Sequence, residues 1–166
     1  KMGYFAQHAM DVLEGDRTVF QMLEDSFPQA GQGPLRALAG AFGFSGDEME
    51  KKCRVLSGGE KARLVMALML FDPPNFLVLD EPTNDLDLET LDLLQGLIAD
   101  YAGTVFLVSH DRDFLDRCCT SVIVSEGDGV WQEYAGGYGD MVTQRGAGVS
   151  ALDKSGGKAS GGKGGS

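Results

Sequence analysis

The stretch Phe76-Leu77-Val78-Leu79-Asp80-Glu81 decides the fold. Four consecutive apolar residues predict a strand buried on both faces, as in a parallel sheet. The two acids follow at the carboxyl end of that strand, where open α/β sheets bind ligands. One carboxylate suits a Mg²⁺ ion, and the other suits polarising a water for attack on a phosphoryl group. A plainer alternative is that the acids cap the next helix.

Strands and helices alternate on both sides of this stretch. Residues 3–7 and 104–108 predict strands, the second one again buried, and shorter strands are expected around 122–124 and 130–134. Helical spacing marks residues 18–23, 88–101, 114–118 and 138–144, and Pro34 suits the first position of a further helix. This alternation predicts an α/β fold with a largely parallel sheet.

Composition excludes several classes of protein. The 166 residues carry 14 basic and 25 acidic side chains, a net charge of −11, and residues 1–145 alone carry −13. So acidic a body argues against a free-standing nucleic-acid binder. The longest apolar run, 64–71, falls far short of the ~20 residues that span a bilayer. Three cysteines without a C-x-x-C motif favour reduced thiols in the cytoplasm over a disulfide framework or zinc site.

Three further features could carry chemistry. Ser57-Gly58-Gly59-Glu60 begins a helix, and its glycines let backbone N–H groups approach an anion, although a plain capping box explains it equally. His110 ends the second buried strand and reaches the same phosphate as the acid pair if the two strands are neighbours. Gln7 could offer its amide to a metal or water. A structural histidine and a surface glutamine are the plainer alternatives.

The order of these features resembles the ATP-binding cassette family. Gln7, Leu56–Glu60, Phe76–Glu81, Asn84–Asp87 and Ser109-His110 look like its Q-loop, signature, Walker B, D-loop and H-loop. LSGGEKARL and DEPTNDLDLETLDLL are similar to the ABC-F subfamily, and VSHDRDFLD with the following residues to the second cassette of its Uup branch. The resemblance implies a P-loop NTPase fold of the ABC ATPase type with an inserted helical subdomain. It also implies a cytoplasmic ATPase that uses ATP and Mg²⁺.

The resemblance assigns roles residue by residue. Asp80 would help to hold Mg²⁺, Glu81 would orient or deprotonate the attacking water, and His110 would contact the γ-phosphate. Gln7 would sense both metal and water. Ser57 and Gly59 would act in trans on ATP held by the other cassette. The residues expected to contact nucleotide are Gln7, Ser57, Gly58, Gly59, Glu60 and Asp87.

The family also sets the expected boundaries and partners. We expect a partial nucleotide-binding domain over 1–145, with its helical subdomain at about 10–72, and a flexible Gly/Ser/Lys-rich linker over 146–166. The Walker A loop and the adenine-stacking aromatic lie upstream of the Q-loop in this family, so we expect an N-terminally truncated cassette that alone neither binds nor hydrolyses ATP. Its expected partners are the first cassette of the same chain and the ribosome and/or branched DNA, with no membrane. The alternatives are the ATPase subunit of a transporter and a non-catalytic interaction module.

Overall fold

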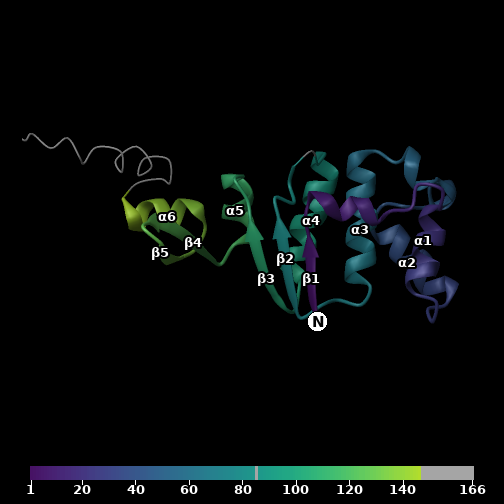
Figure 1. Ribbon diagram of the computed structural model, residues 1–166, viewed down its shortest axis with the longest axis horizontal. Coiled ribbons are helices and arrows are strands. Elements are labelled where there is room, and N and C mark those ends of the chain that lie inside the picture. Colours follow the sequence, from purple (N-terminus) through teal and green to yellow (C-terminus); the bar gives the residue numbers. More distant parts are fainter. Residues whose placement is uncertain (85, 147–166) are drawn as a thin grey trace, which may run out of the picture. The chain divides into compact units, whose positions relative to one another are not determined.

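The computed structural model describes residues 1–84 and 86–146. The chain divides into two compact units, Lys1–His110 and Asp111–Ser166 (Figure 1). Residues 147–166, most of the predicted linker, lie outside the described residues. The domain boundaries expected from the sequence therefore stay a prediction.

A parallel sheet of three strands organises the first unit, in the order β1-β2-β3. The strands are β1 (Met2–Phe5), β2 (Phe76–Asp80) and β3 (Thr104–Val108). In the register, Val78 on the central strand pairs with Tyr4 on one side and Phe106 on the other. The predicted parallel arrangement is confirmed, and the two long apolar strands are direct neighbours.

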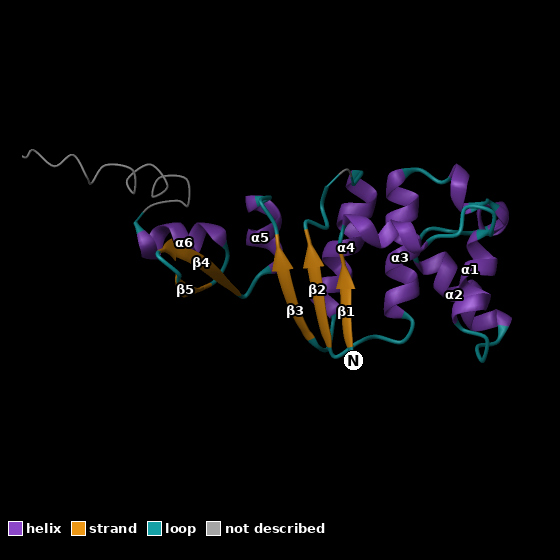
Figure 2. Ribbon diagram, viewed as in Figure 1, coloured by secondary structure: helices purple, strands orange, loops and turns teal. Residues whose placement is uncertain are grey.

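Helices fill the connections between these strands (Figure 2). Those between β1 and β2 are η1 (Gln7–Val12), α1 (Val19–Ser26), α2 (Gln32–Ala41), η2 (Gly46–Glu50), η3 (Cys53–Val55) and α3 (Gly58–Leu70), and α4 (Leu88–Asp100) joins β2 to β3. The prediction that Pro34 opens a helix is wrong, because α2 begins at Gln32. Proline is tolerated inside this first turn because the N–H that it lacks has no partner within the helix.

One face of the sheet is covered by α3 and α4. Phe5, Leu77 and Leu79 are buried on that face, where they meet side chains of both helices around a small apolar gap. The middle of α3 is also buried, at Ala62 and from Leu64 to Ala67.

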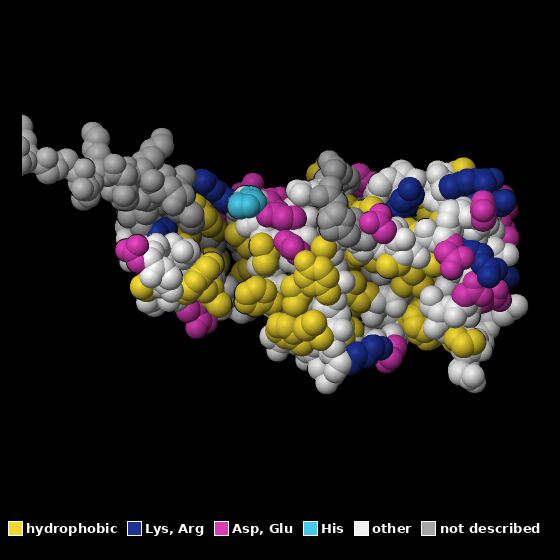
Figure 3. All heavy atoms as spheres, in the orientation of Figure 1, with side chains coloured by type: hydrophobic (Ala, Val, Ile, Leu, Met, Phe, Trp, Pro, Cys, Tyr) yellow, Lys and Arg dark blue, Asp and Glu magenta, His cyan; other side chains and the backbone are white. Residues whose placement is uncertain are grey.

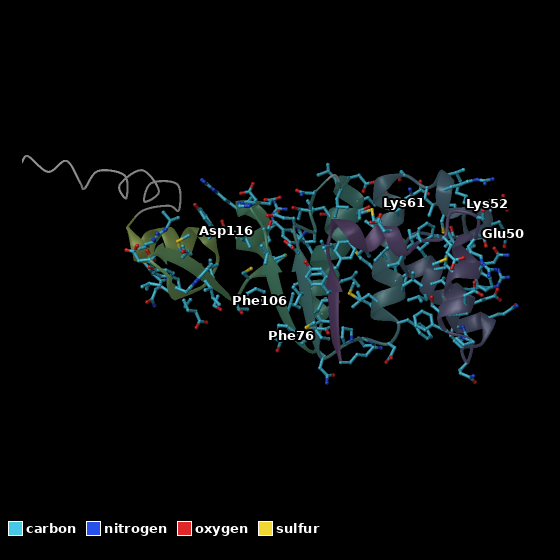
Figure 4. The ribbon with its side chains drawn as sticks, viewed as in Figure 1. Glu50, Lys52, Lys61, Phe76, Phe106 and Asp116 are labelled. Carbon is cyan, nitrogen blue, oxygen red and sulfur yellow. The ribbon has the colours of Figure 1, made fainter. Side chains whose placement is uncertain are left out.

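The opposite face of the same sheet is open. The prediction of two strands buried on both faces is wrong there: Phe76 and Val78 are half-buried, and Phe106 is 46% exposed. The helices of the first unit that pack on the sheet, α3 and α4, lie on the face of Leu77. Figure 3 shows hydrophobic side chains gathered over the strands, and Figure 4 marks Phe76 and Phe106 there.

The second unit is a hairpin between two short helices. Its elements are α5 (Arg112–Cys118), β4 (Ser121–Gly127), β5 (Val130–Ala135) and α6 (Tyr138–Arg145), close to the predicted segments. Asp128 and Gly129, both with positive φ (50° and 78°), form the two-residue hairpin turn. Val122, Val124 and Met141 form its core.

Across residues 1–84 and 86–146, no helix combines the length and the apolar character needed to cross a bilayer.

Candidate active site at the carboxyl edge of the sheet

The carboxyl ends of β2 and β3 bring Glu81 and His110 together. The two strands end side by side, with Asp80 paired to Val108, and the backbone N–H of Glu81 donates to the Val108 carbonyl at 2.8 Å. Beyond the strand ends, His110 Nε2 lies 3.3 Å from Glu81 Oε1, and the His110 backbone N–H donates to Glu81 Oε2 at 3.4 Å. The structure thus brings His110 to Glu81 because β2 and β3 are neighbours, whereas the predicted reach of His110 to the same phosphate as the acid pair stays a prediction.

This pair is open to solvent on the histidine side. The His110 side chain is 97% exposed, whereas that of Glu81 is 24% exposed. Figure 3 shows histidine surface beside acidic surface above the ends of the strands. An imidazole so exposed can also reach a ligand that approaches this edge.

Glu81 adopts a backbone conformation that most residues avoid. Its φ is 47°, in the left-handed region, where a side chain with a Cβ costs about 1–2 kcal/mol. The hydrogen bonds to Val108 and His110 hold it there. Such outliers cluster at functional sites, where surrounding contacts over-determine them.

Asp80, the last residue of β2, is held by a tyrosine from the neighbouring strand. The Tyr4 hydroxyl donates a hydrogen bond to Asp80 Oδ2 at 2.9 Å. That bond raises the pKa of Tyr4 above its ordinary value, with smaller contributions from desolvation and from the charge of Asp80. Tyr4 was not among the predicted site residues. The signal that could have found it is strand alternation. Tyr4 pairs with Val78, which lies two residues before Asp80 and therefore on the same face of β2.

The donor set at this edge fits a hard cation in part. Asp80 and Glu81 offer carboxylate oxygens, which Mg²⁺ prefers. Among the described residues, no cluster of three or more His, Cys, Asp or Glu side chains surrounds a possible metal position. Mg²⁺ generally takes one or two carboxylates from the protein and fills its octahedron with waters and substrate phosphates.

The start of α3 forms a second cluster. Ser57 is the N-cap, its Oγ accepts from the Glu60 N–H at 3.1 Å, and the Ser57 N–H donates to Glu60 Oε1 at 3.3 Å. The capping box expected from the sequence is therefore present. The N–H groups of Gly58 and Gly59, in the first turn, have no partner within the helix, so this end of α3 keeps its anion-binding character.

Glu60 is also engaged within the chain. Its Oε2 lies 3.5 Å from Lys51 Nζ. Burial raises the pKa of Glu60, but hydrogen bonds from Ser57 and the charge of Lys51 outweigh it and hold the pKa below its usual value. The predicted contact of Glu60 with nucleotide stays a prediction, beside a capping role that the geometry assigns.

Gly59 connects this helix start to the cap of α4. Asp87 is the N-cap of α4 and accepts from the Thr90 N–H at 2.7 Å. The nearby Thr90 hydroxyl and the hydrogen bond from the Thr90 N–H lower the pKa of Asp87. A Cβ on Gly59 would lie 2.7 Å from Asp87 Oδ2, so only glycine fits here without a shift. The two predicted residues are thus neighbours.

Gln7 and Asp85 are the remaining predicted positions. Gln7 begins η1, directly after Ala6 and the end of β1, and so follows the same edge of the sheet as Asp80. Asp85 of the predicted D-loop lies outside the described residues.

Comparison with known proteins agrees with the motifs. The family model described as ABC transporter matches residues 1–84. The ATP-binding protein Uup of Caulobacter vibrioides is 50% identical over 62% of this chain and 17% of its own length. Uup of Escherichia coli is 44% identical over 87% of the chain and 23% of its own. The energy-dependent translational throttle protein EttA of Mycobacterium tuberculosis is 42% identical over 84% and 26% respectively.

A solved structure supports the fold. The ATP-binding cassette MJ0796, a dimer in a post-hydrolysis state bound to ADP and Pi, superposes with a TM-score of 0.58 at 24% identity, covering 74% of this chain and 57% of that one. This likeness shows an ABC-type P-loop NTPase fold. The chain spans about a fifth of the length of the curated relatives, which are ABC-F ATP-binding proteins such as Uup and EttA. With half of its residues matched by the family model, the chain belongs to the ABC transporter family of ATP-binding cassettes.

Proposed function

We propose that this chain is part of a cytoplasmic two-cassette ATPase of the ABC-F type, in which ATP binding and hydrolysis drive closure of the cassettes. The observation that carries the proposal is the carboxyl edge of the sheet. There, Glu81 is held in a left-handed conformation against His110, next to the carboxylate of Asp80. The similarity to Uup and EttA supports the same conclusion.

Each group at this edge has a defined task in the hydrolysis of ATP. Glu81 orients the attacking water and accepts its proton as oxygen bonds to the γ-phosphorus and the bond to ADP breaks. His110, anchored by Glu81, donates to the γ-phosphate oxygens. Asp80 would hold Mg²⁺, with Gln7 as a further oxygen ligand, and the bound ion would supply charge neutralisation to the phosphates.

The second cluster serves an opposing cassette. Ser57, Gly58 and Gly59 present the start of α3, whose dipole and first-turn N–H groups attract phosphate. Asp87 packs against this start through Gly59, so the two form one surface. We propose that the surface closes on ATP bound by the first cassette of the same protein, which makes ATP a switch of shape.

The test of the chemistry is Glu81→Gln in the complete protein that contains this chain. Because the amide cannot accept the proton of the attacking water, ATP turnover should fall at least about 100-fold, while ATP binding persists. Glu133→Gln, the same change at an exposed position on β5, is the matched control and should keep wild-type turnover. Undiminished turnover of the Glu81→Gln variant would contradict the proposal.

We further propose the ribosome as the macromolecular target. The relative whose name states a role, EttA, is a translational throttle protein. Residues 1–145 carry a net charge of −13, and so acidic a body disfavours contact with the phosphates of RNA or DNA. Contacts with nucleic acid are therefore expected to come from other parts of the complete protein.

Co-sedimentation separates the ribosome from DNA as the target. The complete Glu81→Gln variant should pellet with ribosomes in ATP but not in ADP, and branched DNA added as competitor should leave this binding unchanged. Displacement by DNA, or binding to DNA alone, would instead identify a genome-maintenance function.

A further inference from the structure

Tyr4 lies on the open face of the sheet, in line with Asp80. In the register of β1 and β2, Tyr4 pairs with Val78, and Asp80 follows two residues later on the same face of β2. The tyrosine is 55% exposed, so burial of its ring does not explain its presence. Its hydroxyl reaches diagonally across to the carboxylate, at 2.9 Å.

The bond occupies only one of the two carboxylate oxygens. Tyr4 donates to Oδ2, so that, as far as the described residues are concerned, Oδ1 of Asp80 can face a ligand at the edge of the sheet. A carboxylate without such a partner rotates about its terminal torsion, which is broad and roughly two-fold. A fixed carboxylate binds a metal better, because outer hydrogen-bond partners orient the ligands of metal sites.

We propose that Tyr4 is a positioning residue for Asp80, whose carboxylate it holds through Oδ2 so that Oδ1 is presented to Mg²⁺. The inference rests on the proposed ATPase function and adds to it a residue that does not itself touch metal or nucleotide. Phenylalanine at this position keeps the ring on the sheet and removes only the donor, which makes Tyr4→Phe the direct test.

The first measurement is a Mg²⁺ titration of ATP hydrolysis by the complete protein. Tyr4→Phe should raise the half-saturating Mg²⁺ concentration about 10-fold, in line with the loss of an outer-shell partner, and should recover nearly wild-type kcat at saturating Mg²⁺. Tyr134→Phe is the matched control. It removes a similar bond, from a tyrosine hydroxyl to Glu126 at 2.7 Å, in the second unit, and should leave the Mg²⁺ dependence unchanged.

A second measurement does not depend on activity. In protein labelled with ¹³C at the tyrosine ring carbon that bears the hydroxyl, the Tyr4 signal is the one that Tyr4→Phe removes. Asp80→Asn should shift this signal at neutral pH, because it replaces the charged acceptor of the Tyr4 hydrogen bond with a neutral amide. A Tyr4 signal that ignores Asp80→Asn would overturn the proposed contact.

The outcomes separate this inference from the proposed function. If the wild type hydrolyses ATP and Glu81→Gln abolishes turnover, but Tyr4→Phe leaves the Mg²⁺ dependence unchanged, the Tyr4 proposal is wrong and the ATPase assignment stands. An equal loss of kcat at every Mg²⁺ concentration also overturns it, because the defect then does not concern the metal. Undiminished turnover of Glu81→Gln defeats the ATPase assignment itself.

Discussion

Replacing Gly59 with alanine tests the packing between the start of α3 and the cap of α4. The added Cβ would lie 2.7 Å from Asp87 Oδ2 and 3.3 Å from Thr90 Oγ1. A contact under 3.0 Å forces the Asp87 carboxylate to move. Because that carboxylate is the N-cap of α4, its movement weakens the 2.7 Å bond from the Thr90 N–H.

Two opposing effects set the magnitude. Loss of an N-cap costs about 1 kcal/mol of stability, and crowding against the buried Thr90 adds to that cost. Alanine in place of glycine stabilises a helix interior by up to about 1 kcal/mol, and less in the first turn. We therefore expect Gly59→Ala to lower the free energy of unfolding by about 1 kcal/mol. Gly58→Ala, with nothing within 4 Å of its Cβ, should raise it by about 0.5 kcal/mol.

Urea denaturation followed by circular dichroism measures both changes on the purified chain. A double-mutant cycle with Asp87→Ala then isolates the contact. In that background the cap is already lost and the carboxylate is gone, so Gly59→Ala should become neutral or stabilising. An equal loss in both backgrounds, or a gain matching that of Gly58→Ala in the wild type, would refute the packing argument.

Two further predictions concern the second unit. Burial, with a smaller effect from Cys119, raises the pKa of Cys118 to about 11. The thiolate is the nucleophile, so alkylation of Cys118 by iodoacetamide at pH 8 should be about 100-fold slower than that of a cysteine with the ordinary pKa of 9.0. The rate of alkylation should rise with pH until about pH 11. A rate that levels off near pH 9 would contradict this prediction. Met141 is fully buried against the hairpin. Met141→Ala should therefore destabilise the unit by about 3 kcal/mol, and Met141→Leu by less than about 1.5 kcal/mol. Hydrogen exchange of the β4 and β5 amides measures both losses. Equal effects of the two substitutions would exclude tight packing around Met141.

Local sequence signals predicted the elements and the second cluster well. The Ser57–Glu60 spacing specifies a capping box that needs no other part of the chain, and the structure contains it. The contact of Glu81 with His110 needed only the assumption that two apolar strands are neighbours, which consecutive parallel strands usually satisfy. The local sequence pattern was thus sufficient to predict features that depend on neighbouring residues alone.

Burial is a property of what covers a strand, and the sequence of the strand does not contain it. Residues 105–108 are as apolar as residues 76–79, yet Phe106 and Val108 are exposed while Leu77 and Leu79 are buried. The difference arises because α3 and α4 contact the face of Leu77. The Tyr4–Asp80 bond escaped prediction for a related reason, since it depends on the register of two strands more than 70 residues apart.

Glu81 shows how the edge combines two carboxylates that a regular strand would separate. Consecutive residues of a strand point to opposite faces, so extended backbone at Glu81 would turn its side chain away from that of Asp80. The left-handed φ of 47° ends this alternation directly after β2. Glu81 then contacts His110 beyond β3, while Asp80 contacts Tyr4 on β1, and both acids serve one edge of the sheet. Glycine would adopt this conformation without steric cost. The presence of glutamate is therefore explained by the chemistry of its carboxylate rather than by the turn.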